Sequence, residues 1–160
     1  MRSTKFFGLI TLLLSTLFIN SQTFTFQQSI ISSTDDAEEK YDGSYITTSS
    51  SDLEMMYDSW NSQGLQTVGL RFNNITIPSN ATIVNAYIQF TADGSSSGNI
   101  DITIKGEDIA YSSTFSNTSN NISNRNTTSS NVVWTPSSSW IDNASGLGQR
   151  TPDISNVVSE

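Results

Sequence analysis

Apolar and polar residues alternate most regularly between Thr67 and Thr91. In the first half of this stretch, Val68, Leu70 and Phe72 occupy one set of alternate positions, and the positions between them are mostly polar. This pattern predicts a strand over 67–73 with one buried face and one face in water.

The same alternation returns after Pro78 and predicts a second strand over 84–90, with Val84, Ala86, Ile88 and Phe90 inward. A third strand follows the Gly-rich and Ser-rich turn 93–98, where Ile100, Ile102 and Ile104 alternate with polar residues. Three successive antiparallel strands with one apolar face need a second layer to cover that face.

The flanking segments give weaker patterns. Apolar alternation predicts an edge strand within 23–31, short strands over 45–48 and 52–58, and another at 132–135. The Ser-rich, Thr-rich and Asn-rich stretch 111–131 is interpreted as a long surface loop or spacer, because it contains too few apolar residues to offset the entropy of ordering it.

A short helix is predicted at the end of the sequence. Thr151 is a suitable N-cap, Pro152 suits the first helical position, and Asp153 favours the positive end of a helix. Ile154, Val157 and Val158 would then lie on one side. A two-turn helix with no cap before Glu160 suggests that closing strands are missing from this sequence.

The predicted fold is all-β: an antiparallel, jelly-roll-like β-sandwich with one short C-terminal helix. We divide the chain of 160 residues into a signal peptide (1–21), an N-terminal edge segment (22–36) and a β-sandwich module (37–160) that is incomplete at its C-terminus.

The leader supports export. Arg2 and Lys5 precede a 14-residue apolar run, Phe6 to Ile19, with cleavage expected after Ser21. As a helix this run would be about 21 Å long, against a hydrocarbon core of about 30 Å, so a membrane span is the weaker interpretation. The expected location is secreted, extracellular or on the cell surface.

Composition excludes several classes of function. Removing the leader leaves 5 of the 7 basic residues against 15 acidic ones, so nucleic acid is an unfavourable partner. The chain has no histidine, which removes the usual Ser-His-Asp and Cys-His relays and histidine-based zinc sites. It also has no cysteine, so stability must come from the core or from bound ions.

The stretch Gly69-Leu70-Arg71-Phe72, followed by Ile77-Pro78, Ala81-Thr82-Ile83 and Ala86 to Phe90, resembles the disaggregatase-related, DNRLRE-type modules of secreted bacterial and archaeal proteins. Asp153-Ile154-Ser155 to Glu160 is similar to their short helix before the closing strands. The resemblance implies a jelly-roll-like sandwich that is often attached to polysaccharide-active enzymes or surface proteins, with carbohydrate binding in some members.

Eight of the 15 acidic residues lie between Asp35 and Asp58. Because calcium prefers oxygen ligands from carboxylates and carbonyls, a structural Ca²⁺ site is one interpretation of this cluster, and a solvated acidic face that keeps the protein soluble is the other. The ligands proposed for Ca²⁺ are Asp36, Glu38, Asp52 and Glu54.

A glycosidase also needs a pair of carboxyl groups. Most of these carboxylates fall at positions predicted to be exposed, where little apolar packing would raise a pKa, so the module is expected to be non-catalytic.

Aromatic residues in polar surroundings are candidates for stacking on sugar rings. Trp60, in the polar loop WNSQG, is the best of them, with Asn61 and Tyr87 as further ligand-binding candidates; Tyr41, Tyr57 and Trp140 are also possible, and Trp134 is expected in the core. The predicted function is a non-catalytic extracellular module that binds a polysaccharide or cell-surface glycan. The alternatives are a spacer that presents a downstream hydrolase, or the N-terminal fragment of a secreted enzyme.

Overall fold

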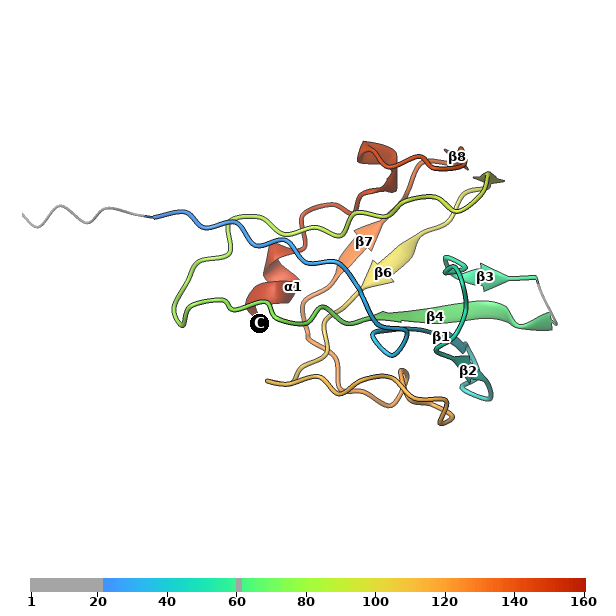
Figure 1. The fold of residues 1–160 in the computed structure, drawn as a ribbon, viewed down its shortest axis with the longest axis horizontal. Coiled ribbons are helices and arrows are strands. Elements are labelled where there is room, and N and C mark those ends of the chain that lie inside the picture. The colour runs from blue at the N-terminus through green and yellow to red at the C-terminus, as the bar shows by residue number, and fades with distance from the viewer. Residues whose placement is uncertain (1–21, 60–61) are drawn as a thin grey trace, which may run out of the picture.

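Antiparallel strand pairs form the regular structure of the protein (Figure 1). The computed structural model describes residues 22–59 and 62–160. Its elements are β1 (Asp36–Lys40), β2 (Ile46–Thr47), β3 (Tyr57–Asp58), β4 (Gly64–Leu70), β5 (Ser96–Ser97), β6 (Ile102–Ile104), β7 (Val132–Trp134), β8 (Ser139–Trp140), a 3₁₀ turn η2 (Leu147–Gln149) and the helix α1 (Ser155–Ser159). Strands with one short helix define an all-β protein.

The largest sheet has the strand order β2-β1-β4-β3. Its centre is β1, whose residues 36 to 40 pair with residues 70 to 66 of β4. Three consecutive residues of β1 are buried (Ala37, Glu38 and Glu39), so both faces of this strand are covered. Part of the acidic cluster therefore lies in a buried central strand, whereas Asp42 and Asp52 are exposed.

Each buried carboxylate of this region accepts hydrogen bonds. Asp35 accepts from Arg71 Nη1 (2.5 Å) and Asn73 Nδ2 (2.5 Å). Glu39, whose exposed fraction is 0 %, accepts from the backbone N–H groups of Ile122 (2.7 Å) and Ser123 (3.0 Å). A buried carboxylate is tolerated only with such partners, and here they join distant parts of the chain.

The segment 111–131 is irregular and mostly exposed, as predicted for a surface loop, but it packs against the sheet and is not a detached spacer. Phe115 is buried in a cluster with Ala37 and Ile46, and Ile122 packs against that cluster. Gly69 on β4 leaves space for the Phe115 ring, since a Cβ on Gly69 would lie 2.6 Å from Phe115 Cζ. Phe115 and Ile122, two of the few apolar residues of the segment, are thus used to hold it on the sheet.

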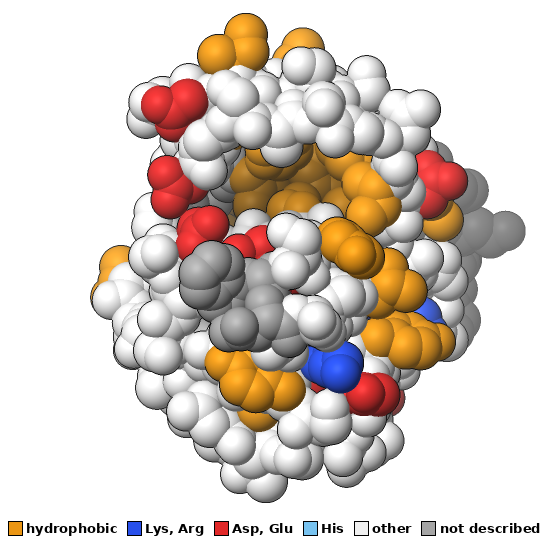
Figure 2. Space-filling view, turned by 90° about the vertical axis from the view of Figure 1, so that its right-hand side faces the viewer, with side chains coloured by type: hydrophobic (Ala, Val, Ile, Leu, Met, Phe, Trp, Pro, Cys, Tyr) orange, Lys and Arg blue, Asp and Glu red, His pale blue; other side chains and the backbone are white. Residues whose placement is uncertain are grey.

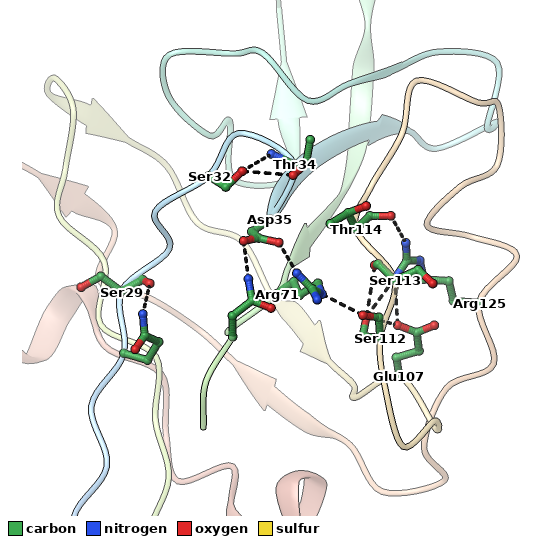
Figure 3. Close-up of polar contacts among 12 residues, drawn as sticks. Ser29, Ser32, Thr34, Asp35, Arg71, Glu107, Ser112, Ser113, Thr114 and Arg125 are labelled. Carbon is green, nitrogen blue, oxygen red and sulfur yellow. Dashed lines mark hydrogen bonds and ion pairs between the residues drawn. The ribbon is translucent and has the colours of Figure 1, made fainter. Parts of the chain in front are cut away.

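A polar network fixes the start of this segment (Figure 3). Arg71 Nε donates to the Ser112 carbonyl (2.8 Å), and the Ser112 hydroxyl donates to Glu107. Arg125 Nη1 lies 2.8 Å from Glu107 Oε2, and its guanidinium stacks 4.4 Å from the centre of the Phe115 ring. Arg71, which follows β4, also contacts Asp35, and Arg125 contacts Glu107. Because both arginines contact Ser112, this network connects the end of β4 to the segment 111–131.

The β6–β7 pair carries the other core. Ile102 and Trp134 are register partners and both are buried, as predicted for Ile102 and for Trp134. Trp134 stacks on Phe90 at 5.5 Å and contacts Trp140 at 6.3 Å between ring centres. The large aromatic side chains fill the space between this pair and the segment 84–92.

The predicted strand 84–90 is absent, although its alternation is retained. Ala86, Ile88 and Phe90 are half-buried while Val84 is exposed, and the segment runs beside residues 144–154. Thr151 N–H donates to the Ile88 carbonyl, and Ile88 N–H donates to the Thr151 hydroxyl, each at 3.0 Å. Because side chains supply part of the pairing, no continuous ladder forms.

The C-terminal helix is confirmed, but it begins at Ser155. Thr151 is used in the contact with Ile88, and Asp153 Oδ1 accepts from Ala86 N–H and Ser155 N–H. Ile154 and Val157 are buried and Val158 is exposed. The proposed N-cap residues therefore attach the helix to the segment 84–92.

The predicted edge strand within 23–31 is also absent: these residues are extended but belong to no strand, and Phe24 and Ile31 are exposed.

Over residues 22–59 and 62–160, none of the helices has the length and apolar character needed to cross a membrane.

Candidate functional site

The four-stranded sheet presents two different surfaces at its β3 end. Residues opposite one another in antiparallel strands project to the same face, so the register assigns each side chain to a face. Glu38 and Thr47 share one face, and Ala37, Glu39 and Ile46 lie on the other, where the segment 111–131 covers them. We describe the two surfaces in turn.

The first surface is a polar depression of about 260 Å³, here called the acidic groove. Strands β1, β2 and β3 and the connection between β2 and β3 supply its lining. The lining residues are Glu38, Tyr45, Thr47, Ser49, Ser50, Glu54, Asp58 and Gln63. Figure 2 shows the end of the molecule that carries β3, with acidic side chains at its surface.

A pair of neighbouring carboxyl groups lies in the acidic groove. Glu38 is 5 % exposed, its Oε1 accepts the Glu54 backbone N–H at 2.5 Å, and the Glu54 carboxyl group is a near neighbour that raises the pKa of Glu38. Burial, followed by this contact with Glu54, raises the pKa of Glu38 from 4.5 to about 8. The raised pKa favours the protonated form of Glu38 near neutral pH, contrary to the expectation that little packing in this cluster would raise a pKa.

This raised pKa predicts a pH dependence of stability. A carboxyl whose pKa is higher in the folded than in the unfolded protein stabilises the fold fully below 4.5, and the contribution is lost as the pH rises through about 8. Each pKa unit corresponds to about 1.4 kcal/mol, but the groove is open to water, so we expect a loss on the order of 2 kcal/mol.

Glu38→Gln should remove this loss, because glutamine mimics the protonated acid. Urea unfolding at pH 5 and pH 9 should show a smaller drop for E38Q than for the wild type, while the exposed control Asp93→Asn should behave as the wild type. Equal drops in E38Q and the wild type would show that Glu38 does not hold the proton.

The proposed Ca²⁺ ligands are only partly brought together. Asp36 and Glu38 lie on the same face of β1, and Glu54 reaches Glu38. Asp52 is exposed, and its carboxylate accepts from the Ser51 hydroxyl at 3.2 Å. Within the described part of the chain, no three acidic side chains gather closely enough to hold a metal ion. The Ca²⁺ site stays a prediction.

The second surface is a row of exposed apolar side chains on the opposite face, here called the tyrosine strip (Tyr41, Leu65 and Tyr57). Tyr57 and Leu65 are register partners of β3 and β4. Tyr41 follows β1, where Lys40 pairs with Gln66, and its N–H donates to the Leu65 carbonyl at 2.8 Å. Tyr57 on β3 and Leu65 on β4 thus share a face, and Tyr41, in the turn that follows β1, lies beside Leu65.

The tyrosine strip is open to solvent. The exposed fractions are 75 % for Tyr41, 56 % for Leu65 and 61 % for Tyr57. Further along the same face, Phe115 and Ile122 cover Ala37, Ile46 and Gly69. Single exposed apolar residues are ordinary, but a contiguous row beside a covered core is typical of an interaction surface.

The predicted ligand-binding residues have different outcomes. Trp60 and Asn61 lie outside the described residues. Tyr87 is 50 % exposed on the segment 84–92, but the Arg150 guanidinium lies 4.6 Å from its ring centre and occupies one face of the ring.

The tyrosine strip was not predicted as a unit, because only strand register reveals that Tyr41 and Tyr57 are neighbours of Leu65.

Comparison with known proteins gives no match: no family model, no curated protein and no solved structure is similar to this chain. The resemblance to disaggregatase-related, DNRLRE-type modules therefore stays a prediction.

Proposed function

We propose that the protein is a non-catalytic, extracellular β-sandwich module of jelly-roll type that binds carbohydrate on the tyrosine strip. The observation that supports this most is the alignment of Tyr41, Leu65 and Tyr57 on one sheet face, all three more than half exposed. The secretory leader predicted from the sequence would place such a surface where polysaccharides are found.

The chemistry of the strip suits sugars. The C–H face of a pyranose ring packs on the flat face of an aromatic ring, and its hydroxyls then need polar partners at the rim. The turn after Tyr41 provides these partners, because Asp42 and Ser44 are both exposed. The Asp42 carboxylate accepts from the Ser44 hydroxyl at 2.5 Å, which holds the turn in place.

The acidic groove supports a non-catalytic assignment. Retaining glycosidases hold their two carboxyl groups about 5 to 5.5 Å apart, and inverting enzymes hold them further apart. Glu38 is 5 % exposed and its Oε1 already accepts the Glu54 backbone N–H, so this carboxyl group offers little access to a glycosidic bond. We assign this pair to the stability of the sheet and not to glycoside hydrolysis.

Tyr57→Ala should weaken polysaccharide binding by about tenfold or more, because a stacking contact worth about 1.4 kcal/mol corresponds to one decade in affinity. Retention on insoluble polysaccharides, measured as the bound fraction against protein concentration, tests this. Since Tyr57 is largely exposed, the variant should unfold at the same urea concentration as the wild type.

Tyr111→Ala is the matched control, because Tyr111 is 88 % exposed and lies next to Ser112 at the other end of β4. Equal retention of the wild type and Tyr57→Ala would refute the assignment of the strip. If no polysaccharide retains the wild type, the spacer alternative replaces carbohydrate binding.

A further inference from the structure

The spacing of the tyrosine strip carries information about its ligand, provided that the strip binds carbohydrate as proposed above. Tyr41 follows β1 and Tyr57 lies on β3, and these strands flank β4 on its two sides. Neighbouring strands are about 4.8 Å apart, so the two tyrosines are separated by about 10 Å with Leu65 midway between them.

A flat, equatorially linked pyranose chain has a matching repeat. Its consecutive rings are spaced much as neighbouring strands are, and in an extended chain alternate rings present the same face. Two rings stacked on Tyr41 and Tyr57 would therefore be one repeat apart, with the ring between them over Leu65. A chain with axial linkages curls into a helix and leaves the row after one or two rings.

Charge selects further among extended chains. The sequence has a net charge of -8, and acidic residues are concentrated in the segment 35–58 that contains Tyr41 and Tyr57. Asp42 lies next to Tyr41, at one end of the strip, and it is exposed. A polyuronate would approach a carboxylate of like charge there, on a chain that is acidic as a whole, whereas a neutral chain would not be repelled.

From these observations we propose that the tyrosine strip binds a neutral, extended, β-1,4-linked polysaccharide that crosses the strands, with at least three consecutive sugar rings over Tyr41, Leu65 and Tyr57. The strip thus selects polysaccharides by their linkage and by their charge. The requirement for three rings follows from the three strands that contribute to it.

Isothermal titration of the purified protein with defined oligosaccharides tests the proposal. Mannohexaose and cellohexaose are the extended neutral probes, maltohexaose is the neutral helical one, and a β-1,4-linked mannuronate hexamer has the extended backbone with charge. We expect mannohexaose or cellohexaose to bind at least about tenfold more tightly than the other two and than the corresponding disaccharide. In Tyr57→Ala the gain in affinity from disaccharide to hexasaccharide should disappear.

The outcomes separate this proposal from the proposed function. Tight binding of maltohexaose or of the mannuronate hexamer, or an affinity that does not grow beyond the disaccharide, would overturn the ligand class while polysaccharide retention that depends on Tyr57 still stands. If no polysaccharide retains the wild-type protein, carbohydrate binding and the ligand class fall together.

Discussion

Glu39→Ala is expected to destabilise the folded protein by about 3 kcal/mol and to release the segment 111–131 from the sheet. Glu39 is fully buried on β1, and its two carboxylate oxygens each accept one backbone N–H, from Ile122 and from Ser123. Alanine would leave both donors without this partner beside a fully buried position, and a donor left unpaired away from water costs about 1 to 3 kcal/mol.

Urea unfolding measures this loss, and hydrogen exchange locates it. The Ile122 and Ser123 amides should be protected in the wild type and should exchange quickly in Glu39→Ala. Asp93→Ala, which removes an exposed carboxylate, should leave both stability and exchange unchanged. A Glu39→Ala protein within about 0.5 kcal/mol of the wild type would rule out this anchor.

Trp134→Ala should cost about 3 to 5 kcal/mol, the range found when a large buried aromatic side chain is removed. Trp134 is 4 % exposed, stacks on Phe90 and contacts Trp140, so its loss leaves a cavity bordered by two other aromatic rings. Because stability is typically 5 to 15 kcal/mol, a large part of it depends on this one residue.

The neighbouring residue of β7 is the matched control. Val133 is 59 % exposed and points to the other face, so Val133→Ala should change the free energy of unfolding by less than about 1 kcal/mol. Both values come from urea unfolding followed by tryptophan fluorescence and circular dichroism. Similar losses in the two variants would show that the core does not centre on Trp134.

The strands that hydrophobic alternation predicted best are those with ordinary apolar faces. β6 and β7 lie within the predicted ranges, Ile102 and Trp134 point inward, and Thr103 and Val133 point outward. In such strands burial and residue type agree, so the pattern in the sequence is sufficient. The short helix was also predicted from local residues, although it begins at Ser155 and its N-cap is Ile154 and not Thr151.

β1 and β4 were harder because their inward residues are not apolar. On β4 the buried positions are Gln66 and Gly69, whereas Val68 and Leu70 are half-buried. Phe115 occupies the space above the glycine. On β1 the buried positions include Glu38 and Glu39, whose partners are 16 and more than 80 residues away. No local pattern contains those partners, so the acidic segment was interpreted as a solvated face or a Ca²⁺ site.

The tyrosine strip was not predicted from the sequence, again because its residues are brought together by distant parts of the chain. Tyr41, Tyr57 and Leu65 were visible as single residues, and two of them were candidates for stacking, but their alignment depends on the register of three strands. A slip of one residue would send any of them to the other face. The prediction of carbohydrate binding therefore rested on Trp60, whereas the proposed platform is built from Tyr41, Leu65 and Tyr57.

Where a bound sugar lies on the protein tests the central proposal most directly. Backbone amide shifts recorded during titration with cellohexaose or mannohexaose should change most at Tyr41, Leu65 and Tyr57, with smaller changes in the turn after Tyr41. Shifts centred instead on Tyr87 and Arg150, or no shifts with any polysaccharide fragment, would contradict carbohydrate binding by the tyrosine strip.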